Sequence, residues 1–160
     1  MTLDEVFTAW MQIAEVQQAV KVVDERIAKL NGAVDVGIYA NFGPIPIPDE
    51  PRIDLINEAL MAVAYQKEGL SSGRARIVKD LMFVNRMVTA LNEWWKGVAL
   101  PHAEKSTQWA LEAIFAARLG NRWASMLSTA TSASEAIEVR LKGLDSIAID
   151  LAVVKKEWNS

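Results

Sequence analysis

Apolar residues recur at alternating spacings of three and four along three stretches of the chain. These stretches run from Val16 to Leu30, from Ile77 to Trp95 and from Ile137 to Leu151. Such spacing is typical of a helix that packs lengthwise against another helix. We therefore expect an all-α fold, an elongated bundle of about five to six helices that forms a single domain over residues 1–160.

The first helix is expected to span about residues 3–30. Thr2 and Glu5 match a capping box, in which each side chain satisfies a backbone N–H at the start of the helix. Near Ile13 the apolar track takes two consecutive steps of three residues, which predicts local overwinding of one continuous helix. The dipeptide Asn31-Gly32 is predicted to end that helix.

Residues 31–50 have a different character. Pro44, Pro46 and Pro48 exclude a helix and impose extended backbone. Because the segment is apolar rather than rich in Ser or Glu, we expect an ordered extended arm or loop, packed either on its own bundle or on a neighbouring subunit. The candidate partner-binding residues in this arm are Tyr39, Phe42, Ile45 and Ile47.

The remaining helices are expected at about residues 51–69, 74–96, 102–119, 122–129 and 132–158. Ser71-Ser72-Gly73 is predicted to connect the first two of these, and Gly120 to end the third. Ser132 and Glu135 match a second capping box. Gly143, inside the last helix, indicates a bend or a close helix crossing.

Charge is distributed unevenly along the chain. The net charge is −3, yet residues 71–130 hold eight basic and four acidic residues, whereas the remainder holds nine basic and sixteen acidic ones. This asymmetry is compatible with an anionic partner, with head-to-tail self-association or with a mixed solvated surface. Arg74, Arg76 and Lys79 are the candidate anion-binding residues, but the acidic total argues against nucleic acid as the partner.

Catalytic and metal-binding motifs are missing from the sequence. There is no cysteine, and the one histidine, His102, has only Ser106 one helical turn away as a potential nucleophile. No phosphate-binding glycine loop and no nucleophile elbow occur. We therefore expect no enzymatic activity, no metal and no cofactor. The sequence shows no secretory leader and no long apolar span, so we expect a cytoplasmic protein of a cell or of a virus infecting it.

Architecture without catalytic motifs favours a non-enzymatic assembly or adaptor protein that acts through protein–protein contacts and associates with itself. Small viral connector and scaffold subunits share this general character. The alternative is a small acidic inhibitor or immunity-type module that binds one protein partner. A bundle that binds a ligand between its helices is the third possibility. The expected partner is a second copy or another protein, without membrane contact.

Overall fold

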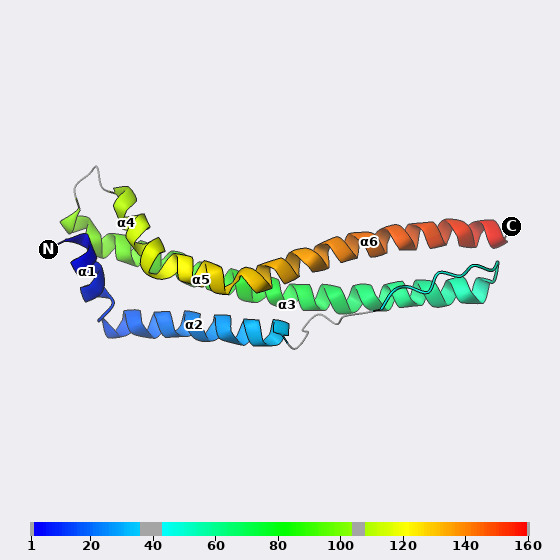
Figure 1. Ribbon diagram of the computed structural model, residues 1–160, viewed down its shortest axis with the longest axis horizontal. Coiled ribbons are helices and arrows are strands. Elements are labelled where there is room, and N and C mark those ends of the chain that lie inside the picture. Colours follow the sequence, from blue (N-terminus) through cyan, green and yellow to red (C-terminus); the bar gives the residue numbers. More distant parts are fainter. Residues whose placement is uncertain (1, 36–42, 104–107, 160) are drawn as a thin grey trace. The chain divides into compact units, whose positions relative to one another are not determined.

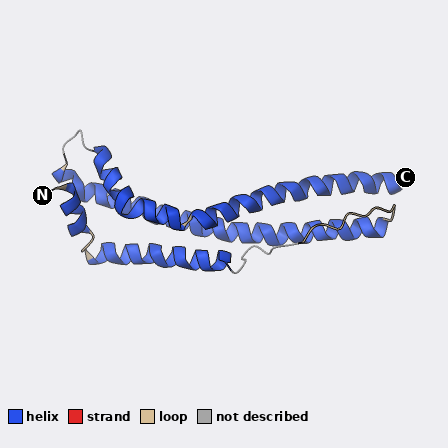
Figure 2. Cartoon of the chain, viewed as in Figure 1, coloured by secondary structure: helices blue, strands red, loops and turns tan. Residues whose placement is uncertain are grey.

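The computed structural model describes residues 2–35, 43–103 and 108–159, and these residues form helices and loops without any strand (Figure 2). The all-α prediction is confirmed. The elements are α1 (Leu3–Trp10), α2 (Ala14–Asp35), α3 (Ile53–Ala99), the 3-10 helix η1 (Leu100–His102), α4 (Gln108–Phe115), the π-helical segment η3 (Ala116–Gly120), α5 (Asn121–Met126) and α6 (Ser128–Asn159) (Figure 1).

The chain divides into two compact units, which we describe separately. Unit 1 comprises Met1–Gly32 and Lys79–Thr131, and unit 2 comprises Ala33–Val78 and Ser132–Ser160. The helix α3 contributes its first half to unit 2 and its second half to unit 1. The contacts given below all lie within one unit.

The predicted first helix is in fact two helices, because the chain turns at residues 11–13 (Figure 1). Its start is as expected, since Glu5 N–H donates to Thr2 Oγ1 at 3.2 Å. At the turn, Ile13 N–H bonds back only three residues, to Trp10 O at 3.1 Å. The prediction of continuous overwinding was therefore wrong. The two consecutive three-residue steps in the apolar track coincide with the turn between α1 and α2. This turn places Trp10 in an aromatic cluster.

The predicted stop at Asn31-Gly32 was also wrong, since α2 continues to Asp35. The side chain of Asn31 donates instead to the carbonyl of Met126 at 2.9 Å, a tertiary bond that leaves the helix intact. Val34 is buried and extends the apolar row of Ile27 and Leu30 by one turn. Packing thus outweighs the local preference of Asn-Gly for ending a helix.

The predicted connection at Ser71-Ser72-Gly73 does not exist, because α3 is one helix of 47 residues. Buried positions continue across it at steps of four, three and four residues, at Gln66, Leu70, Gly73 and Ile77. A helix-interior glycine costs about 1 kcal/mol relative to alanine. The continuous buried row offsets that cost, so glycine and serine do not interrupt the helix here.

Two further predicted boundaries in the second half of the chain were wrong. Gly120 does not end a helix, because the chain passes through η3 directly into α5. Ser132 does not cap one, because α6 begins at Ser128 and Ser132 lies inside it.

Unit 1 is organised around aromatic side chains from α1, α3 and α5. The ring centroids of Phe7 and Trp95 lie 4.7 Å apart, and Trp10 packs within 6 Å of Trp94 and Trp95, at 5.8 and 5.7 Å. The indole N–H of buried Trp95 donates to the carbonyl of Leu111 at 2.9 Å, which ties α3 to α4. These ring contacts, two of them edge-to-face, and the indole hydrogen bond fix the directions of α1 and α4.

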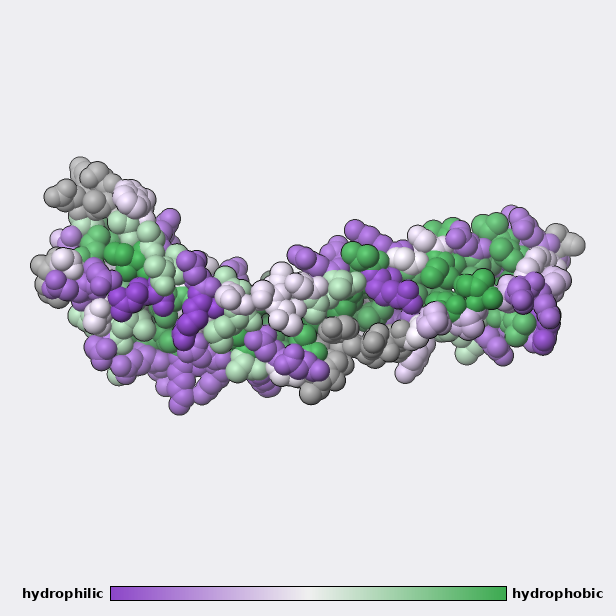
Figure 3. All heavy atoms as spheres, viewed as in Figure 1, coloured by the Kyte–Doolittle hydropathy of each residue, from purple (hydrophilic) through white to green (hydrophobic). Residues whose placement is uncertain are grey.

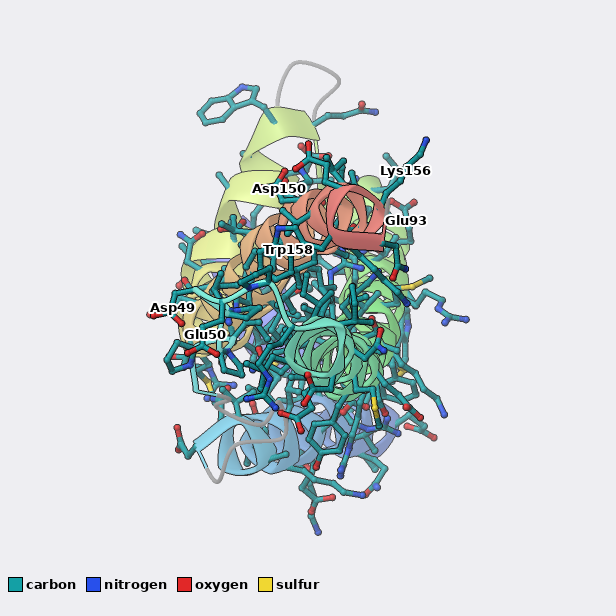
Figure 4. All side chains as sticks on the ribbon, turned by 90° about the vertical axis from the view of Figure 1, so that its right-hand side faces the viewer. Asp49, Glu50, Glu93, Asp150, Lys156 and Trp158 are labelled. Carbon is teal, nitrogen blue, oxygen red and sulfur yellow. The ribbon has the colours of Figure 1, made fainter. Side chains whose placement is uncertain are left out.

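Unit 2 pairs the first half of α3 with α6. The ion pairs Lys67–Asp145 and Arg74–Glu138 show that the two helices run antiparallel, since residue numbers rise along one and fall along the other. Their shared seam contains buried Ile56, Val63, Leu70 and Ile77 of α3 and buried Ile137, Leu144 and Leu151 of α6. Trp158 lies on the α3 side of α6, whereas Asp150 and Lys156 lie away from it (Figure 4).

Candidate functional site

Unit 1 contains a groove of about 680 Å³ between its helices. Its apolar floor consists of Phe7, Met11, Val20 and Leu119. The rim consists of polar and charged side chains: Thr8, Gln12, Gln17, Lys21, Asp24, Glu25, Arg118 and Arg122. An apolar floor with a polar rim, in a volume between about 300 and 1,000 Å³, is typical of sites that bind another molecule.

Three helices (α1, α2 and α5), the η3 segment and the turn after α1 position these side chains. Gln17, Lys21 and Asp24 follow one another at steps of four and three residues, so they share one face of α2 over about 10 Å at 1.5 Å per residue. The turn after α1 brings Met11 to one end of this face. The opposite wall comes from η3 and α5, and a π-helical segment is rare in proteins and frequent at functional sites.

Ion pairs hold the two walls of the groove. Arg118 Nη1 donates to Asp4 Oδ1 at 2.9 Å, and its guanidinium lies 5.2 Å from the ring centre of Phe7. Asp24 Oδ1 accepts two bonds, from Arg122 Nη2 at 3.1 Å and from the indole N–H of Trp123 at 2.7 Å. These contacts join α1 and α2 to the η3–α5 segment.

The lining of the groove is close to neutral, because Asp4, which pairs with Arg118, offsets the one excess cation of the lining. It includes three cations, Lys21, Arg118 and Arg122, against two carboxylates, Asp24 and Glu25. A guanidinium has five N–H donors. The described contacts use only Nη1 of Arg118 and Nη2 of Arg122, so donors remain at the groove for a bound molecule.

A second feature of unit 1 is an ion triplet between α3 and α4. Lys96 Nζ lies 2.7 Å from Glu112 Oε1 and 3.3 Å from Glu93 Oε1. Hydrogen bonding to Glu112, and then to Glu93, raises the pKa of Lys96. The amine therefore stays cationic and links the two helices.

Unit 2 exposes large apolar side chains on the outer faces of both helices. The residues more than half exposed are Met61 and Tyr65 on α3 and Val139, Ile149 and Val153 on α6. On each helix they lie opposite the buried seam, because their positions are about half a turn from those of the seam residues. The space-filling view shows apolar residues gathered over the C-terminal half of α6 (Figure 3).

The described part of the predicted arm packs on unit 2. Ile45 is only 8% exposed, whereas Ile47 is 61% exposed. Gln66, 6% exposed, holds this segment: its Nε2 donates to Gly43 O at 2.7 Å, and its Oε1 accepts from Arg140 Nη2 at 3.0 Å. Within the described residues, then, part of the arm lies on its own chain.

The candidate partner-binding residues of the arm are placed only in part. Tyr39 and Phe42 lie outside the described residues, Ile45 contributes to the interior of its own unit, and Ile47 faces solvent. Partner binding by these residues stays a prediction.

The predicted anion-binding residues are not among those that line the groove of unit 1. Arg74 is half-buried and lies 3.7 Å from Glu138. Arg76 and Lys79 are exposed, and none of the ion pairs among the described residues includes them. Their role in binding an anion stays a prediction.

The uneven distribution of charge along the sequence does not make either compact unit basic. Unit 1 contains nine basic and nine acidic residues, and unit 2 contains eight basic and eleven acidic ones, so the net charge of −3 belongs to unit 2. The basic middle of the chain is neutralised where Asp4 and Asp24 meet Arg118 and Arg122.

The groove could not be predicted from the sequence because its walls are about a hundred residues apart along the chain. The only signal was the spacing of the two arginines, one helical turn from each other.

The described residues contain no group of histidine, aspartate and glutamate side chains arranged to hold a metal ion. His102 is exposed at the end of η1, and Ser106 lies outside the described residues. Over the same described ranges, no helix is both long and apolar enough to cross a membrane.

Comparison of the chain with models of protein families, with curated proteins and with solved structures finds no match.

Proposed function

We propose that the protein is a non-enzymatic assembly or adaptor subunit that acts through protein–protein contacts and associates with itself. One observation carries the proposal. Both helices of unit 2 present large apolar side chains on the face opposite their shared seam. A helix with apolar residues on two opposite faces is typical of helical assemblies, in which each helix packs against more than one neighbour.

The energetics support an occupied surface rather than a free one. Full burial of one Val, Ile or Met side chain contributes about 1.5–3 kcal/mol. Val139, Ile149 and Val153 follow α6 over four turns, so a single helix laid along this face covers all three. Their combined burial is of the size that offsets the loss of freedom on association, which is several kcal/mol.

The acidic inhibitor-like module is retained as a second candidate because the negative charge is concentrated in unit 2. A basic surface on a foreign protein would be complementary to it, and charge complementarity raises the rate and specificity of association. In that case the outer faces of unit 2 bind a different chain, and the free protein is a monomer.

Replacement of the α6 outer residues tests the proposal. The variant Val139→Ser/Ile149→Ser/Val153→Ser removes apolar surface without changing charge or any buried residue. Sedimentation velocity should show a species smaller than the wild-type multimer. The matched control Ala136→Ser/Ala152→Ser changes two exposed, uncharged positions of α6 that lie to the sides of this face, and it should leave the sedimentation coefficient unchanged. An unchanged multimer in the triple apolar variant would exclude this face as the contact.

A further inference from the structure

Two ion pairs define the register of the antiparallel helices in unit 2. Lys67 of α3 lies level with Asp145 of α6, and Arg74 lies level with Glu138. In both pairs the two residue numbers add up to 212. Each position of α3 in this unit therefore has a known level on α6, and the outer faces of the two helices can be compared residue by residue.

The apolar residues of the two outer faces lie at the same levels. Met61, exposed on α3, lies level with position 151, midway between the exposed residues Ile149 and Val153 of α6. Val139, exposed on α6, lies level with position 73 of α3, one residue from the small and exposed Ser72. An outer face of α3 set against an outer face of α6 in this register brings apolar side chains against apolar or small ones.

Charged residues on the same faces have opposite signs at matching levels. Arg76 of α3 lies level with position 136, next to Glu135 of α6, and Glu68 lies level with position 144, two residues from Lys142. Within the described part of the chain, the side chains of Arg76, Glu68 and Glu135 take part in no ion pair or hydrogen bond. Lys142 makes only an exposed ion pair of 3.9 Å with Glu138. These charges are therefore available to a neighbour, and their complementarity favours this register.

Contact of α6 with a second α6 explains fewer of these features. An antiparallel pair centred on Ser146 sets Val139 against Val153 of the other copy. It also sets Glu135 against Glu157, and like charges that face each other are unfavourable. The outer face of α3, with its exposed Met61, would stay uncovered.

We propose that α6 of a second copy packs along the outer face of α3, antiparallel to it and in the register of the chain's own α3–α6 pair. The proposal rests on the self-association put forward as the function, and it names the two surfaces that meet. These surfaces are different, so the contact is head-to-tail. Each copy binds one neighbour through α3 and another through α6, and the array closes into a ring or continues as a filament.

Engineered disulfides test the contact in the full-length protein, because the chain contains no cysteine. Ser72→Cys and Val139→Cys are made in separate copies of different mass, which are mixed and oxidised. The proposed contact brings the two Cα atoms within the roughly 7 Å that a disulfide tolerates, so the mixture should give a mixed dimer. Within one chain these positions lie on opposite outer faces of two packed helices, beyond that distance. A chain that carries both cysteines should therefore form a ladder of covalent multimers.

A matched pair of positions and a charge exchange provide the controls. Ala75→Cys/Ala136→Cys lies at the same level of the helices but on opposite flanks of the contact, so it should give no ladder. In the chain with both cysteines, Arg76→Glu should lower the crosslinked fraction by a factor of about five, the size expected for a reversed surface ion pair. Adding Glu135→Arg should restore the crosslinked fraction.

The outcomes separate this contact from the function on which it rests. A disulfide between two copies of Ser146→Cys in place of the mixed dimer, or a multimer that forms no ladder, would overturn the α3–α6 contact while self-association stands. A crosslinked fraction that ignores the charge exchange would overturn the register. Absence of any intermolecular disulfide from a protein that sediments as a monomer would overturn both the contact and the proposed function.

Discussion

The clamp formed by Gln66 gives a test of how unit 2 is held together. Its amide is the junction of three segments, because it donates to the carbonyl of Gly43 and accepts from the guanidinium of Arg140. Gln66→Ala removes both bonds and leaves the segment around Ile45 attached through apolar contacts alone. We expect this single change to destabilise unit 2 and to loosen that segment.

The magnitude follows from the two bonds. The neutral bond to Gly43 contributes about 1 kcal/mol, and the bond from charged Arg140 about 1.5–3 kcal/mol. Gly43 is exposed and Arg140 is half-buried, so water recovers part of both interactions in the variant. The expected loss in the free energy of unfolding is therefore about 2 kcal/mol. Gln66→Glu keeps an acceptor for Arg140 but sets a second acceptor against the carbonyl of Gly43, so it should not restore the bond to Gly43.

Urea denaturation followed by circular dichroism measures this loss, and limited trypsin digestion after Arg52 reports release of the segment. Gln18→Ala, at an exposed position of α2, is the control and should change stability by less than about 0.5 kcal/mol. If Gln66→Ala unfolds at the same urea concentration as the wild type and Arg52 is cleaved no faster, Gln66 does not hold this segment.

Three further predictions follow from the described contacts. Gly143→Ala should stabilise the protein by about 1 kcal/mol in thermal unfolding, because an added Cβ meets nothing within 4 Å and α6 gains helix propensity; destabilisation would mean that this position is covered. Trp95→Phe removes the bond to Leu111 and should cost about 1 kcal/mol beyond any change in packing; a neutral result would contradict this link between α3 and α4. The side-chain hydrogen bond from Arg52 lowers the pKa of Asp54. The stability that this pair contributes to the folded state is therefore present above the ordinary carboxyl pKa and is lost as pH falls through the lowered value. In an NMR titration Arg52→Gln should return the pKa of Asp54 to its ordinary range, and an unchanged pKa would contradict the contact.

The apolar spacing predicted the helices and most of their buried faces because both depend on local periodicity. Val23, Ile27 and Leu30 are buried as one row, and so are Leu144 and Leu151. The cap at Thr2 was equally local and is confirmed by its bond to Glu5. Features of this kind need only the geometry of one helix, so a single sequence is sufficient to predict them.

Helix ends were mispredicted where tertiary packing outweighs local preference. Gly73 is buried inside α3, and Asn31 uses its amide to bind the carbonyl of Met126 instead of ending α2. The groove could not be predicted for a related reason. Its walls meet only because Asp24 accepts bonds from Arg122 and Trp123, almost a hundred residues away, and no local pattern encodes such a pairing.

The central claim is that the chain associates with itself, and its mass in solution tests this most directly. Light scattering over a range of protein and salt concentrations should give a fixed multiple of the 17.7 kDa chain mass, and a multiple of six or more would indicate a ring-like assembly. A mass of one chain at every concentration would contradict self-association and would favour the module that binds a foreign protein.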